Sequence, residues 1–205
     1  LDEEDSVPHS GSDVVKNSGM AVKRAKSMGQ AQHSWYTAAF GHEVRARTRM
    51  LHALRRAVAE DTLFLAYQPQ INLQTGEVFA LEALMRWRGT HQQFVPPDQF
   101  IPIAEDSSLI VPIGDWVLHT ACGQARRWLD RGELSGRMAV NISHRQLKLA
   151  NLVDSVRSAL QHSGLPAECL ELEITESMAM DTTQETLDTL VRLREMGVHL
   201  TIDDF

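Results

Sequence analysis

Polar residues that could bind a metal ion recur near the ends of apolar, strand-like segments. They are Glu82 in VFALEAL, Asn141 in RMAVN, Glu173 in LELE, and the adjacent Asp203 and Asp204 in LTIDD. Successive members lie about two, one and one strand-plus-helix units apart, where one such unit is about 30 residues. Because the strand ends of an α/β barrel open on one face, we expect these side chains to converge there.

Such a site would concentrate carboxylates in a partly buried place, which is strongly unfavourable without compensation. Oxygen ligands select hard divalent cations, so Mg²⁺ or Mn²⁺ is the natural partner. The adjacent Asp203 and Asp204 could let one carboxylate bridge two metals, an arrangement suited to in-line displacement at phosphorus. A single acid at a strand end is more often a helix cap or a salt-bridge partner, as Glu176 could be. The spacing of the set favours a shared site but names no substrate.

The elements that would position these residues alternate between strand and helix. Strands are predicted in LFLAYQPQIN, VFALEALMRW, RMAVNIS, ECLELEIT and VHLTIDDF. Helices are predicted over 96–106, from a cap at Asp115 to Gly132, in LVDSVRSALQHSG, and in QETLDTLVRLREMG with Leu187, Leu190, Val191 and Met196 facing inward. This alternation predicts right-handed crossovers and a parallel sheet. It fits a little over half of a (β/α)₈ barrel, or an open doubly wound sheet, although no GxGxxG follows any strand.

The N-terminal part of the chain has a different texture. Residues 12–29 predict a short helix, and HSWY predicts a brief extended piece. A longer helix is expected over 42–61, where Val44, Leu51 and Val58 recur every seven residues and five arginines occupy the other faces. A connecting helix with solvated basic faces explains that pattern.

Composition limits the class of protein. The chain has 205 residues, 43% hydrophobic and 23% charged, and a formal net charge of −7, which argues against a binder of nucleic-acid polymers. No apolar run or signal peptide predicts a membrane segment, and Cys122 and Cys169 are expected to be free, buried thiols of a cytoplasmic protein. The histidine spacing does not predict a zinc site. Since the chain opens with LDEED and closes within TIDDF, we expect a piece of a longer protein, which could be membrane-tethered through upstream domains.

Six ordered motifs carry a resemblance to a known family. LEALMRW at 81–87 resembles the EALxR signature of the EAL family of cyclic-di-GMP phosphodiesterases. YQPQINL resembles its first strand, FIPIAEDSSLI its FIPxAE helix, and AVNIS, ELEITES and TIDDF its NxS, ExTE and DDFG motifs. The resemblance implies that residues 61–205 form the N-terminal part of a TIM-like (β/α)₈ barrel, ending at the DDF motif.

The preceding residues resemble a second family more weakly. Residues 1–38 resemble the C-terminal tail of a GGDEF domain, and residues 39–60 would form the helix that connects it to the EAL domain. Within that resemblance Lys26 would bind nucleotide phosphate, whereas a solvated helix lysine explains it equally well.

The resemblance to the EAL family also implies roles for individual residues. Glu82, Asn141, Glu173 and Asp203 would ligate one metal, while Asp203 and Asp204 would serve a second, with Glu82, Asp203 and Asp204 as the catalytic residues. Gln68 would contact the dinucleotide near a guanine, Arg86 would pair with a phosphate, and Glu176 would anchor the loop beyond its strand. The cofactor would be Mg²⁺ or Mn²⁺ in a two-metal site. Ser108 replaces the usual glycine of the family, which is expected to alter only a turn.

Three functions fit these residues. The first is a metal-dependent phosphodiesterase that converts cyclic-di-GMP to linear pGpG in bacterial signalling. Its 205-residue piece would be inactive, because the lysine and later glutamate of the family are not among its residues. The second is a catalytically silent EAL domain that acts as a cyclic-di-GMP receptor, and the third is an unrelated metal-using barrel enzyme. The family often dimerises, so a homodimer through the EAL domain is a further expectation.

Overall fold

The structure, a computed structural model, describes residues 15, 18, 19, 22, 37–89, 93–134, 136–148, 151–180 and 183–203. It contains two compact units, Leu1–Ala53 and Leu54–Phe205. The four isolated residues from 15 to 22 are helical, as predicted, whereas HSWY and Lys26 lie outside the described residues.

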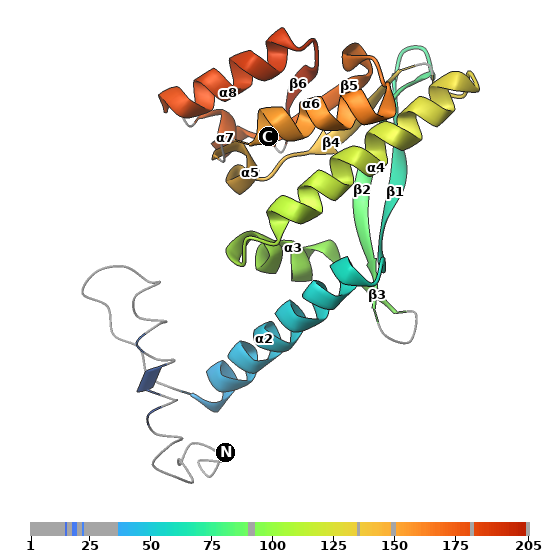
Figure 1. Ribbon diagram of the computed structural model, residues 1–205. Coiled ribbons are helices and arrows are strands. Elements are labelled where there is room, and N and C mark those ends of the chain that lie inside the picture. Colours follow the sequence, from blue (N-terminus) through green and yellow to red (C-terminus); the bar gives the residue numbers. More distant parts are fainter. Residues whose placement is uncertain are drawn as a thin grey trace. The chain divides into compact units, whose positions relative to one another are not determined.

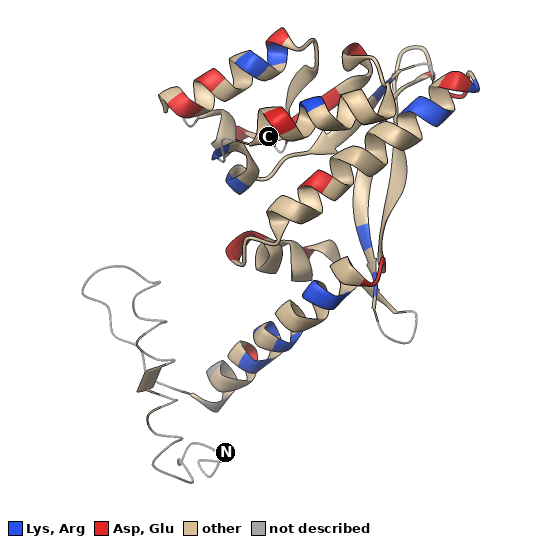
Figure 2. Ribbon diagram, viewed as in Figure 1, with Lys and Arg blue, Asp and Glu red and all other residues tan. Residues whose placement is uncertain are grey.

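Helix α2 (Ala38–Ala59) begins in the first unit and ends in the second. It starts four residues before the range of 42–61 that the periodicity predicts and one residue before the range of 39–60 that the family resemblance implies. Leu54 and Ala57 are buried. Of the arginines predicted to be solvated, Arg45 is half-buried, and the others are exposed: Arg47, Arg49, Arg55 and Arg56 (Figure 2). None of the described helices has the length and apolar character that crossing a bilayer requires.

The second unit is built on one sheet. Its strands are β1 (Leu63–Ile71), β2 (Val78–Arg88), β3 (Phe94–Val95), β4 (Arg137–Asn141), β5 (Leu170–Thr175) and β6 (His199–Asp203). The order is β1-β2-β4-β5-β6, with β3 paired to β2 outside this path (Figure 1). Strands β2, β4, β5 and β6 run parallel, as predicted, but β1 is antiparallel to β2.

The antiparallel start follows from the short LQTGE connection, which is too short for a crossover. The Asn72 side chain accepts hydrogen bonds from the backbone N–H groups of Gln74 and Thr75, and Gly76 adopts a left-handed φ of 73°. These features close a tight turn and return the chain beside β1.

Helices cover one face of the sheet. The helices of this unit after α2 are α3 (Pro97–Asp106), α4 (Ile110–Asp130), α5 (His144–Lys148), α6 (Leu152–Ser163), α7 (Glu176–Ala179) and α8 (Gln184–Glu195), with a 3₁₀ turn η3 (Ala167–Cys169) before β5. In Figure 1, α4, α6 and α8 lie over the parallel strands. Their buried side chains, such as Leu118 and Val156, form a core together with Met138, Val140 and Leu172 of the sheet. The other face of the strands is therefore left to the polar residues that alternate with these apolar ones.

Two helix predictions are wrong in detail. Helix α4 begins at Ile110, so Asp115 lies inside the helix and does not cap it. In α8, Thr186 and Leu193 are buried while Leu187 and Val191 are 41% and 55% exposed. The apolar residues of α8 cover a wide arc, and Leu187 and Val191 lie on its exposed side.

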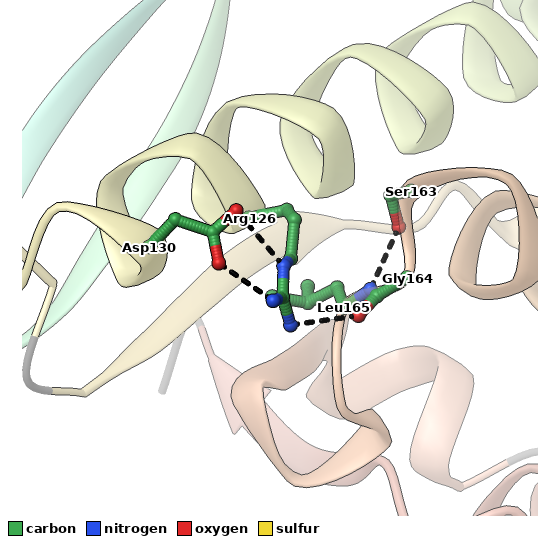
Figure 3. A network of polar contacts seen from close by, with 5 residues as sticks. All are labelled: Arg126, Asp130, Ser163, Gly164 and Leu165. Atoms are coloured by element: carbon green, nitrogen blue, oxygen red, sulfur yellow. Dashed lines mark hydrogen bonds and ion pairs between the residues drawn. The ribbon is translucent and has the colours of Figure 1, made fainter.

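A polar network fastens the end of α6 to α4 (Figure 3). Gly164 closes α6 with a left-handed φ of 68°. Arg126 of α4 donates a 3.1 Å hydrogen bond to the Gly164 carbonyl oxygen and forms a 2.6 Å ion pair with Asp130. Ser163 Oγ accepts a hydrogen bond from the Leu165 N–H. The Gly164 carbonyl and the Leu165 N–H thus both have side-chain partners where the chain leaves α6 and turns back to β5.

The two cysteines are free thiols, as predicted. Cys122 is buried, and burial raises the pKa of its thiol to about 12, whereas Cys169 is only half-buried.

Candidate active site

The sheet register brings the predicted residues to one face. Glu82 pairs with Ala139 on β4, and Asn141 pairs with Glu173 on β5. Since side chains alternate between faces, Glu82, Asn141 and Glu173 all lie on the face opposite the helices. Asp203 pairs with Thr175, two residues beyond Glu173, and therefore shares this face.

These residues form a diagonal across the strands. On moving from one strand to the next, the following site residue either pairs directly with the previous one or lies two residues further along the strand. In a barrel the strands are tilted, so a diagonal in register becomes level with respect to the barrel axis. Glu82 lies in the middle of β2, not at its end, since β2 continues to Arg88. It still meets β4, whose pairing with β2 covers only Ala80 to Ala83.

Direct contacts join part of the set. The Asn141 amide Nδ2 donates a 2.8 Å hydrogen bond to Glu82 Oε1. This bond fixes the positions of two of the predicted metal ligands relative to each other.

Glu173 is the most unusual member. Its side chain is only 4% exposed, and its Oε1 accepts a 3.1 Å hydrogen bond from Gln70 Nε2. Its Oε2 is buried and has no hydrogen-bond partner in the described part of the chain. Burial raises the pKa of Glu173 to about 7; the Gln70 hydrogen bond lowers it, and the nearby carboxylates of Glu82, Asp203 and Glu171 raise it. An unpaired buried carboxylate oxygen calls for a proton or a cation.

The donors fit a hard divalent cation in type, since all of them are oxygens and one is buried without a partner. Among the described residues, no three carboxylate, imidazole or thiol groups are gathered closely enough to hold a metal as they stand. Asp204, the predicted ligand of the second metal, lies outside the described residues. The structure thus provides a shared face and mutual electrostatic influence, not a closed coordination shell.

The predicted substrate-binding residues share this face. Gln68 is exposed and pairs across the hairpin with Glu82. Arg86 lies four residues after Glu82 on β2, is half-buried, and donates from Nη1 to the Met85 carbonyl oxygen at 3.0 Å. Glu176 is exposed at the start of α7, directly after β5, and its role as an anchor of that loop stays a prediction.

The sequence did not lead us to several polar residues that precede the site residues on the same strands. Glu171, 5% exposed, forms a 2.5 Å ion pair with Arg137 and accepts a hydrogen bond from Thr201 Oγ1. Gln70 was missed as well. The face of the sheet that carries Glu82, Asn141, Glu173 and Asp203 is here called the site face. The two-residue period of ELE in β5 and of RMAVN in β4 could have placed Glu171 and Arg137 on it. No local pattern predicts the contact of Gln70 with Glu173.

An α/β sheet with helices on one face and several oxygen-bearing polar side chains on the other defines the class, a barrel-type protein with a candidate cation site. The family model described as the EAL domain matches residues 51–205, which is most of the chain. The chain therefore belongs to the EAL family.

Two relatives from Pseudomonas aeruginosa are similar over 94% of the chain. One is the bifunctional diguanylate cyclase/cyclic di-GMP phosphodiesterase MucR, 39% identical over 193 residues, and the other is the cyclic di-GMP phosphodiesterase NbdA, 41% identical. The chain spans only 28% and 25% of their lengths, about a quarter of each.

Solved structures support the fold. The PaMucR phosphodiesterase in complex with c-di-GMP has a TM-score of 0.74 and 45% identity over 77% of this chain and 64% of its own. The EAL enzyme Bd1971 bound to cAMP and cyclic-di-GMP has a TM-score of 0.75 and 26% identity over 99% of this chain and 53% of its own. These similarities confirm the predicted fold class, part of a TIM-like barrel, over the open doubly wound alternative.

Proposed function

We propose that the full-length protein hydrolyses cyclic-di-GMP to linear pGpG with the help of Mg²⁺ or Mn²⁺. The observation that carries this proposal is the buried Glu173 Oε2, which has no hydrogen-bond partner among the described residues and lies within electrostatic reach of Glu82 and Asp203. The similarity to MucR and NbdA supports the substrate, since both relatives are named as cyclic di-GMP phosphodiesterases.

The acids and the amide of the site face would bind two cations. Glu82, Asn141, Glu173 and Asp203 would hold one cation, and Asp203 with Asp204 would hold a second. When bound, such cations would supply charge stabilisation at phosphorus and activation of water.

The remaining residues would bind and orient the dinucleotide. The planar guanidinium group of Arg86 suits a phosphate, because its fork of N–H donors matches two phosphate oxygens. Gln68, exposed beside Glu82 on the neighbouring strand, would contact a guanine. Glu176 would keep the loop after β5 in place behind the ligands.

The wider setting is part of the same proposal. We expect the EAL domain to act in a bacterial protein that also contains a GGDEF domain, in line with the bifunctional name of MucR. A cytoplasmic location and a homodimer through the EAL domain stay predictions. The 205-residue chain alone is expected to be inactive, because the lysine and further glutamate implied by the family resemblance are not among its residues.

The test is a turnover assay with the full-length protein, cyclic-di-GMP and either Mg²⁺ or Mn²⁺, with nucleotides resolved by chromatography. We expect pGpG to appear only with metal, and Glu82→Ala to abolish it. Glu77→Ala is the matched control, because Glu77 is an exposed glutamate of the same hairpin outside the site. Tight binding of cyclic-di-GMP without turnover would contradict the phosphodiesterase and establish the receptor alternative.

A further inference from the structure

The hydrogen bond from Gln70 to Glu173 joins two strands that are not neighbours in the sheet. Gln70 lies on β1 and Glu173 on β5, and the strand order places β2 and β4 between them. Neighbouring strands are about 4.8 Å apart, so a flat sheet would separate β1 from β5 by about 14 Å. A glutamine side chain cannot span that distance. The sheet must therefore curl, and Gln70 contacts the acid site from across the curve.

An irregularity of the hairpin sits beside Gln70. Gln70 pairs with Ala80 and Ile71 pairs with Val78, so Phe79 is the extra residue of a β-bulge. The Phe79 carbonyl lies against Gly136, where a Cβ atom would be only 1.9 Å from its oxygen. Bulges increase the local twist and redirect neighbouring side chains, often next to active sites. The bulge and the glycine together let β1 end with its glutamine directed into the curve.

Glu171, on the same strand as Glu173, is a buried acid whose carboxylate is fully paired with protein groups. Both of its oxygens have partners, because Arg137 pairs with Oε2 and Thr201 donates to Oε1. Glu173, two residues later and equally buried, receives one hydrogen bond on Oε1 and none on Oε2 from the described residues. The difference indicates that one oxygen of Glu173 is held while the other is kept for a ligand.

We propose that Gln70 is a positioning residue for Glu173: its amide holds Oε1 and thereby leaves Oε2 available to the divalent cation. This inference rests on the proposed function, since it concerns the same cation site. Gln70 itself contributes no ligand to the metal. It acts by fixing the rotamer of a carboxylate that lies near Glu82 and Asp203 and would otherwise be driven away from them by charge repulsion.

The variant that isolates this role is Gln70→Met, because methionine has nearly the same length and volume but no N–H donor. Partners that orient metal ligands typically affect metal affinity 10- to 100-fold, so we expect the Kd for Mn²⁺ to rise about 10-fold or more. Gln70→Asn keeps the amide but withdraws it by one methylene, and should weaken Mn²⁺ binding as well. Turnover of Gln70→Met at saturating Mn²⁺ should recover to near the wild-type kcat, because the ligands themselves are unchanged.

The experiment measures Mn²⁺ binding to the full-length protein by titration calorimetry, with folding checked by circular dichroism. Gln74→Met is the matched control, since Gln74 is an exposed glutamine in the turn of the same hairpin and should leave the Kd unchanged. Wild-type Mn²⁺ affinity in folded Gln70→Met would overturn the positioning role.

Glu173→Gln separates this inference from the proposed function. If the wild-type protein binds Mn²⁺ and Glu173→Gln abolishes binding while Gln70→Met does not change it, the positioning role alone is wrong. If the wild-type protein binds no Mn²⁺, both the cation site and the role of Gln70 are contradicted.

Discussion

At the scale of single residues, Glu173 combines two properties that seldom occur together. It is a carboxylate in the buried layer of the sheet, and it is surrounded by further acids that oppose its charge. In proteins such groups either take up a proton or bind a cation, and the two possibilities have different consequences for stability.

The first prediction concerns stability of the metal-free chain against pH. Burial raises the pKa of Glu173 from an ordinary 4.5 to about 7, so between these values the folded state holds a proton that the unfolded state releases. The free energy of unfolding therefore keeps its full value with respect to Glu173 below about pH 4.5. It falls as the pH rises from there through about 7, and then levels off. The loss amounts to at most about 3 kcal/mol.

Urea unfolding with a chelator, at a series of pH values, measures this effect. Glu173→Gln cannot ionise and should be free of this part of the pH dependence, so it should gain stability over the wild type at pH 8 but not at pH 4. An identical pH dependence in the two proteins would show that Glu173 titrates normally.

Ser108 shows at the same scale what a sequence comparison can and cannot predict. Its place in a turn was predicted, and its φ of 65° explains why the family usually has glycine there. The structure adds that Ser108 Oγ accepts a 2.6 Å hydrogen bond from Arg145 of α5. A partner 37 positions away could not be inferred from the turn alone.

At the scale of elements, the junction of β2 and β4 depends on Gly136. The carbonyl of the bulged Phe79 occupies the space that a side chain at 136 would need, and backbone atoms there cannot move aside cheaply. The bulge in turn precedes the strand segment that carries Glu82. The packing of the Phe79 carbonyl against Gly136 thus supports the position of the strand segment that carries Glu82.

The second prediction compares two glycines. Gly136→Ala should destabilise the chain by about 2 kcal/mol or more, because the new Cβ overlaps the Phe79 carbonyl. Gly123→Ala, in the interior of α4, meets only the Arg127 side chain at 3.7 Å and should stabilise by about 0.5–1 kcal/mol through helix propensity. Chemical denaturation measures both, and equal effects of the two substitutions would refute the close approach.

Elements were easier to predict than their contacts. The recurrence of strands about every 30 residues predicted the parallel strands, and the barrel interpretation of that spacing predicted that Glu82, Asn141, Glu173 and Asp203 share a face. The direction of β1 was not part of the prediction, and its antiparallel pairing with β2 follows from the short turn between the two strands. The contact of Gln70 with Glu173 joins residues 103 positions apart and depends on the curl of the sheet, which no local pattern encodes.

At the scale of the whole molecule, the described part of the sheet has β1 and β6 at its two edges. Beside β6, the exposed side of α8 carries Leu187 and Val191, and Ile202 of β6 is itself 41% exposed. Unpaired strand edges beside apolar side chains favour association between chains.

The third prediction is that the 205-residue chain self-associates in solution. Leu187→Glu combined with Val191→Lys should increase the monomer fraction, because it replaces exposed apolar surface by charge. Arg192→Ser combined with Glu195→Ser is the control, since it changes exposed polar residues of the same helix. Analytical ultracentrifugation at several concentrations measures the outcome, and a monomeric wild-type chain would contradict the prediction.

The central claim is that the acids of the site face bind the cation used for hydrolysis of cyclic-di-GMP. The most direct test compares Mn²⁺-dependent turnover by the full-length protein with that of two substitutions on β5. Glu173→Gln should reduce turnover at least about 100-fold, because it removes an ionised metal ligand. Glu171→Gln, two residues away and already paired with Arg137 and Thr201, should retain most of the activity. Equal losses in both variants, or full activity in Glu173→Gln, would contradict the account.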